Sequence, residues 1–338
     1  MPVAETLFCI ATFFGQTIIS GIVGNLIAPY VRFHKMGSSD KTTPNTSGLS
    51  PKDVNQLHLR RLFRLLDQEL SDQVAVSVCK KVGITVKDFA LHADLGTRKG
   101  VSKGHLFFKP LSKSRIGRYA FDMHDKTTKL LVQEGKKLWF DDKPPNEQTA
   151  YDCCTIIEAH FTGMKWKKGK YSCTLAKLSG WKTSGMFSNG RLDPEILRGK
   201  YRPSSSVDDD EGWNGAFSYC WDRVGDGQAH IGFTMCHETT PAKDTLQRRE
   251  LMAIVGVMLT RMKSPYFEEH HVIPVILVSC FNECKARILQ AHLRETHLVI
   301  YKSRLYDFSN PKNREESLPL FLAYMSSESV GTTNFNRS

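Results

Sequence analysis

The strongest constraint on the fold of this chain is a helical apolar pattern that is followed closely by strand-length apolar runs. One face of the expected helix consists of Leu251, Ile254, Val255, Met258, Leu259 and Met262. Residues 272–279 (VIPVILVS) form a continuous, β-branched run, and residues 286–293, the turn 294–296 and residues 297–308 complete an apparent meander. We therefore expect an α+β fold, in which an N-terminal helical segment precedes a mixed sheet with a C-terminal helix-plus-meander unit.

Three segments of this unit, PVILVS (274–279), ARILQAH (286–292) and SRLYDF (303–308), resemble a stretch of uncharacterised proteins from filamentous fungi. The resemblance spans residues 246–308, which is under a fifth of the chain. It carries no assigned activity, so it implies a lineage and little about chemistry.

Composition shifts and polar breaks suggest how the rest of the chain is organised. The expected parts are an apolar segment at 1–36, a linker at 37–50, a helical region at 51–95, a basic α+β domain at 96–325 with a mobile acidic loop at 202–212, and a frayed polar tail at 326–338. In the helical region, Ser50-Pro51 starts a helix, and Thr85 and Asp88 are expected to cap another after Gly83. This order matches a helix-turn-helix, but Asp88 and Asp94 would repel phosphate, which favours a structural hairpin.

The N-terminal segment 6–31 contains no charged residue, and it is long enough to cross a bilayer as a helix. Its polar and glycine residues leave three interpretations open: a single membrane anchor, a buried or surface-lying helix, and a self-assembling cross-β motif suggested by the related tetrapeptides GQTI and GNLI. Arg32, Lys35 and Lys41 follow the segment, so an anchor would leave the body of the protein in the cytosol.

The net charge of +11 is unevenly distributed along the chain. Positions 1–224 carry 33 Lys and Arg against 23 Asp and Glu, whereas positions 225–338 carry 13 against 12. A positive surface attracts a polyanion such as nucleic acid or an anionic membrane. The mobile loop at 202–212 is acidic and could fold over such a surface and screen it.

The densest basic run is interleaved with aromatic residues, which is typical of surfaces that bind single-stranded nucleic acid. The candidate polyanion-binding residues are Lys109, Lys113, Arg115, Arg118, Lys165, Lys167, Lys168 and Lys170. Residues 165–170 (KWKKGK) also have the form of a basic hairpin turn. The alternative is an ordinary sheet with a buried aromatic face and a solvated Lys/Arg face.

Common catalytic and metal motifs are missing from the sequence. It contains no Gly-rich phosphate loop and no G-x-S-x-G elbow. Cys280 and Cys284 have a spacing that zinc ligands use, and Cys236-His237 or His270-His271 could complete a site, but paired CxxC or HExxH motifs are absent. The odd number of cysteines, nine, and the missing secretory signal instead indicate reduced thiols in an intracellular protein. Because the motifs are missing, we expect no metal or other cofactor.

One catalytic alternative remains, a metal-dependent nuclease of the PD-(D/E)xK type. Its residues would be Glu250, Glu269, Glu283 and Lys285, where Glu283-Cys284-Lys285 supplies the E-x-K triplet. Such an enzyme holds Mg²⁺ between carboxylates. Glu269 stands in place of the expected Asp, in a polar turn, so a non-enzymatic intracellular binding or accessory protein is the preferred prediction.

Overall fold

The computed structural model describes residues 48–68, 71–91, 107–134, 141–183, 202–203, 212–213, 217–223 and 227–334. The expected apolar segment at 1–36, with the possible anchor at 6–31, lies outside these residues, as do most of the linker and residues 204–211 of the loop. Among the described residues, no helix has the length and hydrophobicity that a membrane span requires.

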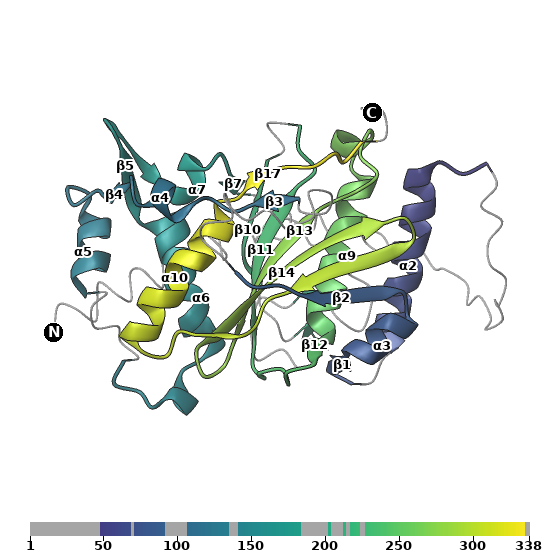
Figure 1. Cartoon of the computed structure of the whole chain (residues 1–338), viewed down its shortest axis with the longest axis horizontal. Coiled ribbons are helices and arrows are strands. Elements are labelled where there is room, and N and C mark those ends of the chain that lie inside the picture. Colours follow the sequence, from purple (N-terminus) through teal and green to yellow (C-terminus); the bar gives the residue numbers. More distant parts are fainter. Residues whose placement is uncertain are drawn as a thin grey trace, which may run out of the picture.

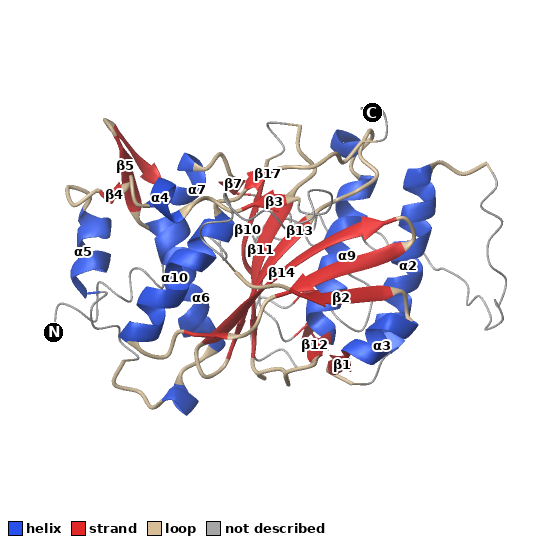
Figure 2. Cartoon of the chain, in the orientation of Figure 1, coloured by secondary structure: helices blue, strands red, loops and turns tan. Residues whose placement is uncertain are grey.

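An eight-stranded mixed sheet lies at the centre of the described structure and confirms the predicted α+β class (Figure 2). In spatial order its strands are β2 (Ile84–Asp88), β15 (His297–Lys302), β14 (Lys285–Arg294), β13 (Val275–Phe281), β11 (Ile231–His237), β10 (Phe217–Asp222) and β7 (Lys182–Thr183), with β16 (Tyr306–Asp307) beside the start of β14. Two pairs are parallel, β13 with β11 and β15 with β2, and the other neighbours are antiparallel.

The parallel pair β11–β13 is buried on both of its faces. Strands of this kind are continuous apolar runs, which explains the sequence of residues 272–279. A parallel connection needs a crossover, and here it consists of β12 (Thr245–Gln247), α9 (Arg248–Lys263) and η4 (Pro265–Phe267). The predicted helix, the predicted strand and the meander that follows are therefore confirmed.

One face of the sheet is covered by α9, onto which α2 (Pro51–Gln68) packs (Figure 1). The buried side of α2 carries Leu59, Leu62 and Leu66 at helical spacing, so a stripe of leucine joins the two helices. Beyond α2, β1 (Gln73–Ala75) pairs with β12, and α3 (Val76–Lys81) leads to Gly83 and β2.

The opposite face is covered by α6 (Ala150–Glu158) and α10 (Pro311–Met325). Thr149 and Asp152 form a capping box at the start of α6, after the short turn η1 (Pro145–Glu147). At its other end α6 continues into one π-helical turn, η2 (Ala159–Gly163). This turn leads the chain away from the sheet.

A small lobe lies at the end of the molecule that is opposite α2 (Figure 1). It consists of α4 (Lys113–Ile116), β4 (Ala120–Phe121), α5 (Lys126–Glu134), β5 (Lys165–Lys168), β6 (Tyr171–Thr174) and α7 (Leu175–Leu178). Strands β4, β5 and β6 form a three-stranded antiparallel sheet, and the hairpin predicted for residues 165–170 is β5–β6. We call residues 111–134 and 164–178 the basic lobe.

Residues 326–334 belong to the folded domain, unlike the frayed tail that their polarity predicts. β17 (Glu328–Ser329) pairs with β3 (Phe108–Lys109), and Asn334 forms a β-bridge with His270. Ser326 and Ser327 are fully buried because they follow directly on α10. A second short pair, β8 (Arg202–Pro203) with β9 (Gly212–Trp213), brackets the acidic loop.

The predicted helix that begins at Thr85 is wrong, because residues 84–88 form β2. Ile84, Thr85 and Val86 are β-branched and pair in parallel with residues 298–300 of β15. Gly83, at φ +89°, makes the turn between α3 and the strand. The local capping signal was outweighed by this strand partner from a distant part of the sequence, so a helix-turn-helix is not formed.

Close contact between Gly232 of β11 and Trp221 of β10 gives a first prediction. A Cβ atom on Gly232 would lie 2.3 Å from the buried indole ring of Trp221, directly opposite. We expect Gly232→Ala to lower the free energy of unfolding in urea by about 1–3 kcal/mol. In a Trp221→Leu background the same substitution should cost much less, and an equal cost in both backgrounds would contradict the steric explanation.

Candidate polyanion-binding surface

The basic lobe concentrates positive charge at one end of the fold. Its residues include ten Lys and Arg but only three Asp and Glu. Seven of the eight predicted polyanion-binding residues belong to it, and Lys109 lies just before it on β3. The side chain of Lys113 lies outside the described part of the structure.

Carboxylates neutralise four of these predicted residues. Lys165 Nζ lies 2.7 Å from Asp125 Oδ2, and Lys167 Nζ lies 3.0 Å from Asp122 Oδ1. Lys109 and Arg115 both pair with Glu328 of β17, at 3.6 Å from Oε2 in the case of Lys109.

Asp122 and Asp125 are firmly ionised. The hydroxyl of Ser172 and the ammonium group of Lys167 donate hydrogen bonds to Asp122 and lower the pKa of its carboxyl to about 2. Lys165 likewise lowers the pKa of Asp125. The face of the hairpin that carries Lys165 and Lys167 is therefore close to electrically neutral at pH 7.

The tip of the β5–β6 hairpin, residues 168–171, is not neutralised by carboxylates in the same way. Within the described residues, Arg118, Lys168 and Lys170 are exposed and form no ion pair or hydrogen bond through their side chains. Lys168 is the cross-strand neighbour of Tyr171, so both side chains project from the same face of the hairpin. Tyr171 is 77% exposed and places an aromatic ring beside these two lysines.

Packing beneath the hairpin holds this tip in place. Trp166 is buried against Phe121, with ring centroids 4.3 Å apart, and its Nε1 donates to the carbonyl of His160 at 3.0 Å. The amide of Lys165 donates to Thr128 Oγ1 at 2.8 Å. The aromatic residues of the basic run thus have two roles, since Trp166 and Phe121 form the core of the lobe while Tyr171 faces solvent.

The four residues of the nuclease alternative are not brought together. Glu269 precedes β13 and Glu283 follows it, so the seven-residue strand separates them by roughly 20 Å. The carboxylate of Glu283 is paired with Lys285, the intended catalytic lysine. Among the described residues, no group of three or more His, Cys, Asp or Glu could hold a metal ion.

Glu250 is committed to a buried ion pair instead of a metal site. Arg287 Nε donates to Glu250 Oε1 at 2.9 Å, and Arg287 Nη2 donates to Oε2. Burial would raise the pKa of the Glu250 carboxyl, but Arg287 outweighs burial and holds this pKa below its usual range. The same carboxylate caps α9 through the amide of Gln247 at 2.8 Å.

A serine and a histidine lie beside this carboxylate, but they do not form a catalytic triad. His237 Nε2 lies 3.2 Å from Ser279 Oγ, and both residues are buried. In the described structure, His237 Nδ1 has no hydrogen-bond partner, so no carboxylate orients the imidazole. Ser279, His237, Glu250 and Arg287 therefore form a structural network between α9 and the sheet.

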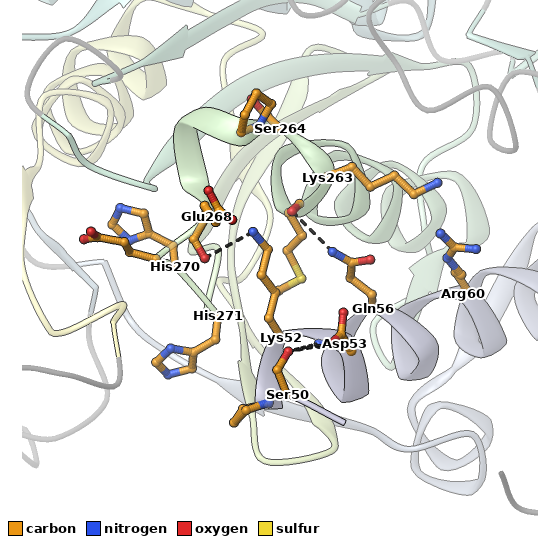
Figure 3. A pocket seen from close by; sticks show the side chains of 14 residues that line it. Ser50, Lys52, Asp53, Gln56, Arg60, Lys263, Ser264, Glu268, His270 and His271 are labelled. Atoms are coloured by element: carbon orange, nitrogen blue, oxygen red, sulfur yellow. Dashed lines mark hydrogen bonds between the residues drawn. The ribbon is translucent and has the colours of Figure 1, made fainter. Parts of the chain in front are cut away.

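The candidate zinc ligands are brought together only in part, because Cys236, Cys280 and Cys284 share one buried core cluster whereas the histidines lie elsewhere. Cys236 and His237 are adjacent on β11, so their side chains point to opposite faces of the sheet. His270 and His271 line a groove of about 910 Å³ between the start of α2 and residues 262–271 (Figure 3). Lys52 joins the two sides of the groove, because its Nζ donates a hydrogen bond from α2 to the carbonyl of Phe267 in η4 at 3.0 Å.

The charges of this groove are mixed. It is lined by the basic residues Lys52, Arg60 and Lys263 and by the acidic residues Asp53, Glu268 and Glu269. This balance makes it a poor site for a polyanion compared with the tip of the hairpin.

Comparison with known proteins found no match to a family model, to a curated protein or to a solved structure. The resemblance of residues 246–308 to fungal proteins therefore stays an expectation.

The buried ion pair supports a second prediction. We expect Arg287→Met to destabilise the protein by about 3–5 kcal/mol, because it leaves the Glu250 carboxylate buried without its cation. The double variant Arg287→Met/Glu250→Gln should recover part of that loss in urea unfolding. A loss below about 1 kcal/mol for the single variant would contradict the structural role of the pair.

Two buried histidines predict how stability depends on pH. Burial lowers the pKa of His230 and of His237 to about 4 in each case. The unfolded chain takes up a proton on each near pH 6.5, whereas the folded protein does not, so stability should fall as the pH drops from about 6.5 toward 4.

Urea unfolding between pH 7.5 and 5 measures this dependence before most carboxylates titrate. We expect a His237→Asn variant, which cannot titrate at this position, to show a shallower fall than the parent protein. A stability that stays constant over this range would contradict the neutral, buried state of both histidines.

Proposed function

We propose that this protein is a non-enzymatic binding protein that uses the tip of the β5–β6 hairpin to hold a polyanion, with single-stranded nucleic acid as the favoured ligand. The observation that carries the proposal is the solvent-facing ring of Tyr171 beside Lys168 and Lys170. Lysines attract phosphate, and an exposed ring offers a surface on which a base can stack.

Geometry favours single strands over a duplex or a membrane. A stacking contact needs an unpaired base, because the bases of a duplex are already stacked. Anionic lipid would use the same lysines, but it has no ring that could stack on Tyr171. The predicted cations Lys165 and Lys167 add little, since Asp125 and Asp122 already satisfy them.

Arg118 and the paired residues Lys109 and Arg115 extend the surface toward α4 and β17. Their exposed ion pairs are worth at most about 1 kcal/mol each, so a bound phosphate could replace Glu328 as their partner. This arrangement would allow a strand to continue beyond the hairpin.

Substitution of the ring is the sharpest test of the proposal. We expect Tyr171→Ala to weaken binding to a fluorescent 20-nucleotide oligothymidylate about 5- to 100-fold in anisotropy titrations, because one stacked base contributes about 1–3 kcal/mol. Tyr266→Ala is the matched control, since Tyr266 is 79% exposed but lies in the groove region at the other end of the fold. It should bind like the parent protein.

Salt titration tests the lysines separately. We expect Lys168→Gln/Lys170→Gln to flatten the slope of log Kd against log salt by about 1.4, since each phosphate contact on a single strand contributes about 0.7. Lys80→Gln/Lys81→Gln, on exposed positions of α3, should leave the slope unchanged.

Three results would contradict the proposal. The parent protein could fail to bind the oligonucleotide at 50 mM salt, or Tyr171→Ala could bind as tightly as the parent. The protein could also bind anionic vesicles without binding the oligonucleotide, and this result would identify the surface as a lipid-binding surface.

A further inference from the structure

One carboxylate, that of Glu328 on β17, contacts two of the predicted polyanion-binding residues at once. Arg115 Nη1 on α4 donates to Glu328 Oε1, and Lys109 Nζ on β3 lies 3.6 Å from Oε2. The side chains of Lys109, Arg115 and Glu328 remain 64%, 49% and 40% exposed. A polyanion that reaches this part of the surface therefore meets the acid together with both cations.

Glu328 is ionised at neutral pH. Partial burial would raise the pKa of its carboxyl, but Arg115 and Lys109 outweigh burial and hold this pKa below its usual range. Two cations and one anion leave the three side chains with a net charge of +1. Half of the positive charge that the sequence places here is therefore cancelled by an acid from the far end of the chain.

The backbone on both sides of Glu328 is held in place. Glu328 itself belongs to the β17–β3 pair. One residue earlier, Nε1 of the buried Trp181 ring donates to the carbonyl of Ser327 at 2.9 Å. Two residues later, the amide of Val330 donates to the carbonyl of Phe107 at 2.9 Å. The carboxylate can rotate about its side-chain bonds, but the strand that carries it cannot withdraw without breaking these hydrogen bonds.

The two paired cations are connected to the hairpin through α4. This short helix packs against α10, and β17 follows α10 (Figure 1). After α4, the amide of Arg118 donates to the carbonyl of Arg115 at 3.3 Å, and Ala120 then pairs with Lys167 of β5. Arg118, which is exposed, therefore lies along the chain between the group held by Glu328 and the β5–β6 hairpin.

We infer that Glu328 is an intramolecular competitor of the polyanion, which restricts binding to the hairpin tip by keeping a carboxylate beside Lys109 and Arg115. The inference rests on the proposed function, and it concerns the regulation of the same surface. A phosphate that approaches the two cations has to displace the carboxylate or bind beside it. Because β17 cannot withdraw, the displaced carboxylate stays close and repels the phosphate.

Removal of the acid should therefore extend the binding surface. Glu328→Gln keeps the length and shape of the side chain and raises the net charge of the group by one. We expect this variant to steepen the slope of log Kd against log salt by about 0.7 for the 20-nucleotide oligothymidylate, which corresponds to binding about fivefold tighter at 0.1 M salt.

Matched variants separate competition from a general change in charge. Glu268→Gln makes the same change of charge at an exposed position of the groove at the other end of the fold, and it should leave slope and affinity unchanged. In a Lys109→Gln/Arg115→Gln background, Glu328→Gln should also have little effect, because no cation remains for it to release. Urea unfolding checks that each variant is folded.

Two results with the oligonucleotide would overturn the inference but leave the proposed function intact. Glu328→Gln could have the slope and affinity of the parent protein. The substitution could also tighten binding equally in the Lys109→Gln/Arg115→Gln background, which would mean that the acid does not act through these two cations.

Elution from a heparin column distinguishes failure of the inference from failure of the proposed function. If neither the parent nor Glu328→Gln binds the oligonucleotide, the proposed nucleic-acid function is wrong. Elution of Glu328→Gln at higher salt than both the parent and Glu268→Gln would then still support Glu328 as a competitor of polyanions. Elution of all three proteins at the same salt concentration would overturn it.

Discussion

Burial of β11 and β13 on both faces is the constraint on which the rest of the fold depends. A parallel pair of this kind cannot be joined by a tight turn, so the chain must cross one face, and α9 does so. The other face must then be covered as well, and α6 and α10 cover it. The basic lobe projects from this second layer through the π-helical turn that ends α6.

The cover that α9 provides over the sheet also explains why Glu250 and Arg287, which are buried beneath it, stabilise the fold and do not bind a ligand. A carboxylate at the start of a buried helix needs both a role in capping and a cation, and Gln247 and Arg287 supply them for Glu250. Motif reasoning treats such a carboxylate as a possible metal ligand because the sequence does not show its partner, which here lies on a different element, β14. The triplet Glu283-Cys284-Lys285 is similar, because in the structure its two charged side chains pair with each other.

Local patterns predicted the parts of the fold that local interactions decide. The apolar face of α9, the run that became β13 and the meander after it were all visible as periodicity within single segments. β2 was mistaken for a helix, and the structured end of the chain for a frayed tail, because both depend on partners from the far side of the sequence. The helix α6 was also missed, although Thr149 and Asp152 have the spacing of a capping box.

The candidate surface was foreseen only in outline. The basic sequence of residues 165–170 predicted the hairpin correctly. It could not show that Asp122, Asp125 and Glu328 would neutralise four of the predicted residues. Tyr171 directly follows the predicted hairpin turn, so its position next to Lys170 was the one available signal for the exposed ring.

The edge of the sheet has a consequence for biosynthesis. β2 pairs with β15, which belongs to the last part of the sequence and is made much later, and β3 must wait for β17 close to the end of the chain. While the ribosome is still translating, the early segments are therefore exposed without their partners. Folding of this domain therefore cannot finish before residues 297–329 have been made, and until then its open strands can pair with another molecule.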